Sequence, residues 1–209
     1  MKLGEIKIQA IQLMYPSVFI RGSDKESLND IISELKSNSG LCPIIESIVG
    51  SINRAMAYLE ARGAVPYECI DIPANQCSPS LGDRVRIDLP KNLLSIERMY
   101  AVADGKAVEC EYEIFGDYAL AKKKNGVYTV IYKKSLKRVG GADDEDTEIE
   151  LLNGIGDALP YFIKADLFSQ DSESEAQEAR AVFDGIVERI ENRPNPCQSC
   201  FESVYTIGG

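Results

Sequence analysis

The sequence predicts an α+β protein, in which a helical core from N-terminal helices and a C-terminal helical hairpin carries an inserted small antiparallel β domain. Apolar residues recur at helical spacing before residue 66 and after residue 157, whereas the segment between them alternates with period two. Because helices flank the strands, both helical parts must share one core. The predicted parts are an N-terminal helical segment (1–66), a β domain (67–139), an acidic linker with the hairpin (140–193) and a flexible tail (194–209).

The first predicted helix covers residues 2–14 and ends before Pro16, since the residue preceding a proline avoids the helical conformation. Ile8 and Ile11 leave a second side of this helix partly apolar, so we expect it to pack between elements or between subunits. The residues that share its main apolar face are Leu3, Ile6, Ala10 and Leu13.

Two more helices are predicted before the β domain. A short one has Leu28, Ile31, Ile32 and Leu35 on one side. A long one covers residues 43–62, because Pro43 suits a first helical turn and Gly63 suits a helix end. Its apolar stripe consists of Ile44, Ile48, Ile52, Met56 and Leu59.

Residues 67–134 predict five or six short strands. Asp104-Gly105 and Asn125-Gly126 are dipeptides typical of tight hairpins. The last strand alternates between two sets of residues, neither strongly polar, which predicts a sheet or sandwich covered at least in part on both faces. The following segment, 140–150, has six carboxylates in eight residues and is predicted to be a solvated connector.

A helical hairpin is predicted over 157–193. Asp157 suits the N-cap of the first arm and Pro160 its first turn, while Ser172 and Glu175 have capping-box spacing for the second arm. Pro194 and Pro196 are expected to end that arm. Charged substitutions on its apolar stripes, at Ile163 or Phe183, are expected to abolish folding. Two residues on its polar face, Lys164 and Arg180, are the predicted subunit contacts.

The amino-acid composition argues against several classes of function. The 209 residues include 33 acidic and 23 basic side chains, a formal charge of -10, which argues against a protein that coats nucleic acid. No apolar run approaches 18 residues and no leader pattern occurs, so we expect a cytosol-made protein without a membrane partner. Histidine is absent, which removes the commonest general base and most catalytic zinc sites. We therefore expect no enzyme activity and no cofactor.

Two weak candidate sites remain. Cys197 and Cys200 have the CxxC spacing of a zinc-binding or redox pair, but no second pair matches them, so the favoured interpretation is incidental cysteines. Glu109, Glu111 and Glu113 alternate along one predicted strand and would share one face. That face could suit a cation or a hydrolytic pair, although a solvated strand face is the favoured interpretation.

One basic patch is predicted in this acidic chain, at the second tight hairpin and the strand that returns from it. It is interpreted either as a solubilising, edge-protecting hairpin or as a contact with phosphate or an acidic partner. Its residues are Lys122, Lys123, Lys124, Lys133, Lys134, Lys137 and Arg138.

The hairpin sequence LPYFIKADLF, followed by an acidic turn and EARAVFDGIVERI, resembles the C-terminal helices of head-to-tail connector (adaptor, or neck) proteins of tailed bacteriophages. The opening MKLGEIKIQAIQLMY, the segment GSINRAMAYLE and a strand-rich insertion ending in VYTVIYKK resemble the same proteins in the same order.

The resemblance implies a non-enzymatic virion protein, made in the host bacterial cytoplasm. It would form a homo-oligomeric ring below the portal protein, join the head to a tail or second neck protein, and enclose transient double-stranded DNA. The basic patch would then face the portal, a neighbouring subunit or DNA, and residues 192–209 would become ordered only on assembly. Two alternatives stay open: another phage tail-completion or baseplate protein, and a small cysteine-dependent metal-binding protein.

Overall fold

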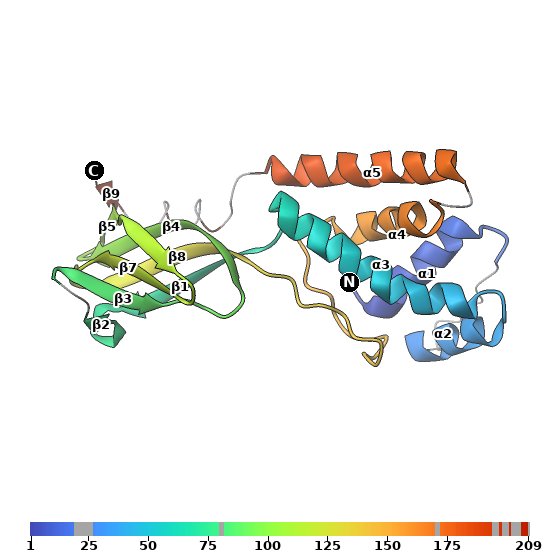
Figure 1. The fold of residues 1–209 in the computed structure, drawn as a ribbon, viewed down its shortest axis with the longest axis horizontal. Coiled ribbons are helices and arrows are strands. Elements are labelled where there is room, and N and C mark those ends of the chain that lie inside the picture. The colour runs from blue at the N-terminus through green and yellow to red at the C-terminus, as the bar shows by residue number, and fades with distance from the viewer. Residues whose placement is uncertain are drawn as a thin grey trace. The chain divides into compact units, whose positions relative to one another are not determined.

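The structure is a computed structural model that describes residues 1–18, 27–79, 82–169, 172–193, 197, 201 and 206–208. It has five α-helices and two β-sheets among these residues (Figure 1), which confirms the predicted α+β class. The chain divides into two compact units. The helical unit comprises Met1–Ala64 and Leu136–Arg193, and the β unit comprises Val65–Ser135 and Pro194–Gly209.

The β unit ends four residues before the predicted boundary at residue 139. The reason is that residues 136–139 bond to the helical unit. The Leu136 amide donates to the carboxylate of Glu60 over 2.7 Å, and Val139 exchanges two hydrogen bonds with the side chain of Asn53, of 2.8 and 2.9 Å.

The three predicted N-terminal helices are α1 (Leu3–Met14), α2 (Leu28–Ser37) and α3 (Cys42–Arg62). Gly63 ends α3 in the left-handed conformation with φ of 70°, as the sequence indicates. Two residues of the predicted apolar stripes, Leu13 and Ile44, are only half-buried. In α1 the buried residues at this end are Ile11 and Met14, and in α3 Ile45 is buried beside Ile44.

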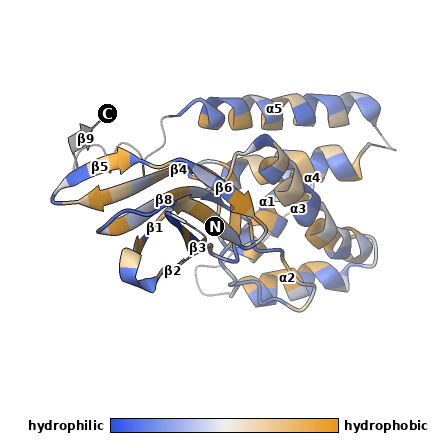
Figure 2. Ribbon diagram, turned by 60° about the vertical axis from the view of Figure 1, so that its left-hand side comes forward, coloured by the Kyte–Doolittle hydropathy of each residue, from blue (hydrophilic) through white to orange (hydrophobic). Residues whose placement is uncertain are grey.

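The C-terminal hairpin consists of α4 (Leu159–Leu167) and α5 (Glu173–Glu191). Hydrophobic and hydrophilic residues alternate along α5, as expected for a helix with one buried face (Figure 2). One predicted cap is wrong and the other holds in position only. Asp157 lies in a preceding 3₁₀ turn, Gly156–Ala158, so Ala158 is the N-cap of α4. Ser172 is the N-cap residue of α5, but its side chain makes no capping hydrogen bond. Pro194 and Pro196 lie outside the described residues.

The acidic segment is not a solvated connector along its whole length, because it packs against the start of α1. The amides of Leu3 and Gly4, which have no partner within a helix, donate to the carbonyls of Thr147 and Glu145 over 2.9 and 2.8 Å. Glu145 and Ile149 are buried. The segment therefore supplies acceptors that the first turn of α1 needs.

The described residues of the β unit form nine strands in two sheets. Their bounds are β1 (Tyr67–Pro73), β2 (Ser78–Pro79), β3 (Arg84–Asp88), β4 (Leu93–Ala103), β5 (Lys106–Glu109), β6 (Tyr112–Phe115), β7 (Tyr118–Lys122), β8 (Val127–Lys134) and β9 (Thr206–Gly208). Eight of them lie between residues 67 and 134, more than the five or six predicted.

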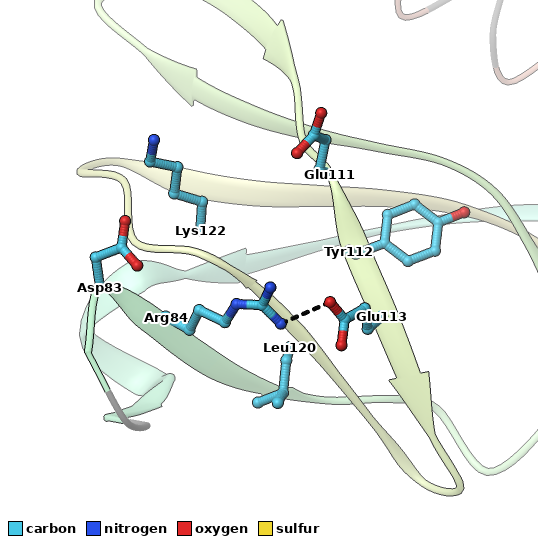
Figure 3. A pocket seen from close by; sticks show the side chains of 7 residues that line it. All are labelled: Asp83, Arg84, Glu111, Tyr112, Glu113, Leu120 and Lys122. Carbon is cyan, nitrogen blue, oxygen red and sulfur yellow. Dashed lines mark hydrogen bonds and ion pairs between the residues drawn. The ribbon is translucent and has the colours of Figure 1, made fainter.

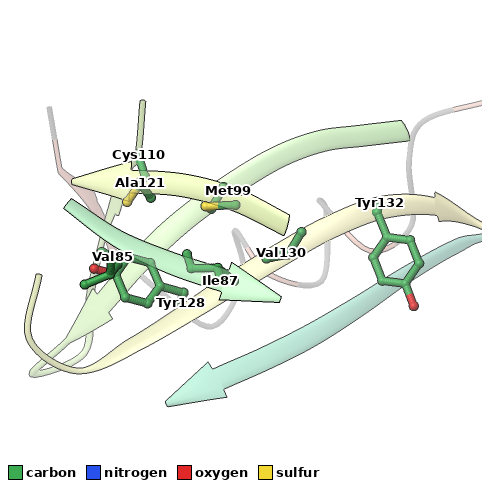
Figure 4. Close-up of a cluster of buried hydrophobic side chains, with 10 residues drawn as sticks. Val85, Ile87, Met99, Cys110, Ala121, Tyr128, Val130 and Tyr132 are labelled. Atoms are coloured by element: carbon green, nitrogen blue, oxygen red, sulfur yellow. The ribbon is translucent and has the colours of Figure 1, made fainter. Parts of the chain in front are cut away.

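The strand order is β1-β8-β4-β5-β9 in one sheet and β2-β3-β7-β6 in the other. All pairs are antiparallel except β5 with β9. One apolar core combines residues of both sheets, including Val85 and Ile87 of β3 with Met99 of β4 and Tyr128 and Val130 of β8 (Figure 4). The sheets therefore cover one another, as predicted for a sandwich.

The described residues of the C-terminal tail contact the β unit, in contrast to the flexible tail predicted over 194–209. The Phe201 ring stacks on Tyr100 with centroids 4.5 Å apart and is buried, and β9 pairs with β5. The reason is that the second face of the five-stranded sheet is also apolar, with Ala107 and Ile131 beside Tyr100. An aromatic side chain from the tail covers that face.

Candidate interaction surfaces

Three consecutive lysines lie where β7 ends: Lys122 is its last residue, and Lys123 and Lys124 begin the turn to β8. This turn is a four-residue connection, Lys123 to Gly126, and not the two-residue hairpin predicted from Asn125-Gly126. The two-residue prediction holds at the other site, where Asp104 and Gly105 both have positive φ, of 52° and 74°. All three lysines are exposed. We call these three residues the lysine tip.

Hydrogen bonds hold the backbone of the lysine tip. The Lys123 amide donates to the Asp83 carbonyl over 2.6 Å, and the Lys124 amide donates to the Tyr128 hydroxyl over 2.7 Å. That hydroxyl donates in turn to the Lys122 carbonyl over 2.9 Å. Burial raises the pKa of the Tyr128 phenol, so it remains protonated and able to donate. The turn is thus anchored while its ammonium groups stay in solvent.

A shallow hollow of about 200 Å³ lies on the Lys122 side of the lysine tip (Figure 3). Arg84 and Glu113 pair across it at 2.8 Å, and Lys122, Asp83 and Glu111 stand around them. Charges of both signs line this hollow, so it favours neither an anion nor a cation.

The rest of the predicted basic patch lies elsewhere. Lys133 and Lys134 are at the opposite end of β8 from the lysine tip, paired with Glu97 at 3.2 Å and Glu68 at 2.8 Å. Lys134, with Tyr132, holds the pKa of Glu68 below its ordinary value. These two lysines therefore serve ion pairs within the β unit.

Lys137 and Arg138 belong to the helical unit. Arg138 pairs with Glu60 at 2.5 Å, whereas Lys137 is exposed. Lys133 and Lys134 therefore lie apart from the lysine tip, and Lys137 and Arg138 belong to the other unit. Sequence proximity does not reveal that β8 separates its two ends or that the chain then enters another unit.

The predicted subunit contacts, Lys164 and Arg180, make contacts within the helical unit. Lys164 pairs with Glu175 at 2.7 Å. The Arg180 guanidinium lies 4.1 Å from the ring centroid of Tyr58 and 4.9 Å from that of Phe162, a cation–π arrangement that stabilises the packing. Arg180 is half-buried against these rings, so its substitution is expected to weaken folding directly.

The cysteine and glutamate candidates are not brought together. Cys197 is half-buried and contacts the Tyr100 and Phe201 cluster, while Cys200 lies outside the described residues. Within the described ranges no group of three or more metal-ligating side chains occurs. The expected shared strand face of the three glutamates is wrong, because Glu109 ends β5 in one sheet and Glu113 belongs to β6 in the other.

A buried ion pair escaped the sequence interpretation. Lys7 and Glu145 meet at 2.7 Å with side chains only 5% and 8% exposed, and the second carboxylate oxygen of Glu145 has no hydrogen-bond partner. The helical position of Lys7, on the same face as Leu3 and Ala10, was the available signal.

Exposed apolar residues mark a second surface. Strand β6 is the edge of the four-stranded sheet, and its Ile114 and Phe115 are 49% and 45% exposed. Phe115 stacks on Tyr118 with centroids 5.7 Å apart. An edge strand with exposed apolar side chains can pair with another chain.

In the part of the chain that the structure describes, no helix has the length and apolarity needed to cross a bilayer. No protein-family model and no curated protein matches the sequence.

Proposed function

We propose that the chain is a structural virion protein that forms a ring of identical copies at the head–tail junction of a tailed bacteriophage. It would join the portal to the tail and line the DNA channel. The proposal starts from the resemblance of LPYFIKADLF, EARAVFDGIVERI and the N-terminal segments to head-to-tail connector proteins.

The observation that carries the proposal is the discontinuous helical unit. Residues 1–64 and 136–193 form one compact unit, and the β unit is inserted between them in the chain. Helices α1 and α3 both pack on α4, so the hairpin completes a core begun by the N-terminus. This is the arrangement that the resemblance implies.

The β6 edge replaces Lys164 and Arg180 as the proposed subunit contact. Ring formation requires a heterologous interface, in which one surface of a subunit binds a different surface of the next. Ile114 and Phe115 on an open edge strand offer one such surface.

Co-purification with the portal protein encoded in the same genome tests the proposal. An affinity-tagged portal should retain this chain in a fixed ratio, and the retained complexes should appear as rings in negative-stain electron microscopy. Replacing Phe115 by Lys should reduce the amount of ring complex that the portal retains, whereas replacing exposed Lys91 by Gln should leave that amount unchanged. Failure of the portal to retain the chain, combined with its recovery from tails or baseplates of virions, would contradict the head–tail assignment.

A further inference from the structure

A second hollow, of about 490 Å³, lies on the other side of the lysine tip from the one in Figure 3. Lys123, Lys124, Asn75 and Asn125 provide its polar lining, and Ala74 and Val85 contribute to its apolar wall. No carboxylate is among the described residues that line it. Such a lining is unexpected in a chain with a formal charge of -10.

Carboxylates and lysines lie on different sides of this turn. Asp83, Glu111 and Glu113 line the hollow on the Lys122 side, while Lys123 and Lys124 line the other. Neither of these two lysines forms an ion pair with a described carboxylate. The neighbouring turn of Asp104 and Gly105 lies at the same end of the sheet, since Val102 pairs with Val127, and it adds one carboxylate there together with Lys106.

The backbone that carries the two lysines is held in place by the fold. The amides of Lys123 and Lys124 are both bonded, as described above, and the Ala74 amide donates to the Gly126 carbonyl over 2.9 Å, which joins the two rims of the hollow. Gly126 has φ of 99°, and a side chain there would collide with the Val102 carbonyl, so only glycine fits. The turn itself therefore need not be ordered when a ligand binds.

We infer that this hollow binds a phosphate group, carried by the backbone of duplex DNA or by a small phosphate ester. Two ammonium groups and two side-chain amides can donate to several oxygens at once, which suits a phosphate better than the two oxygens of a carboxylate. The inference holds whether or not the chain forms a ring.

Fluorescence anisotropy with a labelled 20-base-pair duplex tests the inference, with inorganic phosphate and poly-glutamate as competitors. Two phosphate contacts would weaken DNA binding by roughly tenfold between 50 and 200 mM salt, since each contact contributes about 0.9 to the logarithmic slope. The double variant Lys123→Gln, Lys124→Gln should lose this salt-dependent binding. The control variant Lys36→Gln, Lys91→Gln removes the same two charges at other exposed lysines and should bind like the parent protein.

The variant Asn75→Asp places a carboxylate in the hollow at almost unchanged volume and should also reduce binding. All substituted side chains are exposed, so the variants should keep the circular dichroism spectrum of the parent. Isothermal titration calorimetry with inorganic phosphate alone covers the case without duplex binding: phosphate binding by the parent protein that the double variant loses would then assign a small phosphate ester. Equal binding by the double variant and the control, competition by poly-glutamate but not by phosphate, or no binding at all would overturn the inference.

Discussion

Lys7 and Glu145 form the most buried ion pair among the described residues, and they join α1 to the acidic segment. A buried charge is costly when its partner is removed, because the remaining charge has neither water nor a counter-ion. The pair therefore acts as a constraint that fixes where the acidic segment lies on α1.

Replacing Lys7 by Met should lower the free energy of unfolding by about 3–5 kcal/mol, because it leaves the Glu145 carboxylate buried and unpaired. Urea unfolding followed by circular dichroism measures the change. Lys2→Met is the matched control, since Lys2 pairs with Asp146 at the exposed surface and its loss should change stability little. The double variant Lys7→Met, Glu145→Leu should recover most of the loss; equal costs for Lys7→Met and Lys2→Met would show that the pair is solvated.

Gly4 is required by the same contact. A Cβ atom at this position would lie 3.0 Å from Cβ of Leu28 and 3.1 Å from Cβ of Glu145. Gly4→Ala should therefore destabilise the protein by about 1–3 kcal/mol, as overpacking does, despite the better helix propensity of alanine. At Gly185 in α5 an added Cβ meets open space, so Gly185→Ala should stabilise by about 0.5–1 kcal/mol. Thermal unfolding of both variants is the measurement, and shifts of the same sign would contradict the packing of α1.

At the scale of elements, the pairing of β1 with β8 carries a polar cluster. Glu68 of β1 accepts from the Tyr132 hydroxyl over 2.6 Å and from the Lys134 ammonium over 2.8 Å. Lys134 and Tyr132 lower the pKa of Glu68, whereas burial, together with Glu68, raises the pKa of Tyr132 to about 12. The cluster thus couples the pairing of two strands to pH.

The direction in which stability changes with pH at Glu68 follows from its lowered pKa. The unfolded chain binds a proton at about pH 4.3, and the folded protein only at lower pH. The stabilisation is therefore present at neutral pH and is lost as the pH falls through the folded pKa. Glu68→Gln should unfold more easily at pH 7 and lose less stability between about pH 5 and 3 than the parent protein. The control Glu111→Gln should lose as much stability as the parent over this pH range. An equal loss in Glu68→Gln would contradict the role of the cluster.

Helical elements were largely predictable from the sequence, and side-chain pairing was not. The bounds of α3 follow from Pro43 and Gly63, which are local signals. Asp157 is not the cap of α4, and Ser172 is the N-cap residue of α5 without the predicted side-chain hydrogen bond, because both match a pattern that other conformations also satisfy. Lys7 and Glu145 are separated by 138 positions, and no local pattern records which distant carboxylate a lysine meets.

The candidate site was predicted only in part, for a related reason. The lysine tip was found from three adjacent lysines beside Gly126. The hollow next to it also needs Asn75, which pairing of β1 with β8 brings close to the turn. The length of β8 places Lys133 and Lys134 at its opposite end. Strand register, which the sequence leaves open, therefore decides which charges act together.

At the scale of the whole molecule, the central proposal is a ring built by heterologous contacts between identical chains. When repeated heterologous contacts close into a ring, the assembly has one fixed size. When they do not close, open filaments of many lengths form. Ile114 and Phe115 pair with Ala119 and Tyr118, at the other end of β7 from the lysine tip, so loss of phosphate binding at Lys123 and Lys124 need not affect assembly.

Mass photometry of the purified chain, alone and with the portal protein from the same genome, tests the ring most directly. We expect a single species whose mass is a fixed multiple of the subunit mass, either at all concentrations or on addition of portal. A chain that stays monomeric under both conditions, or that forms a ladder of increasing masses, would contradict the proposed ring.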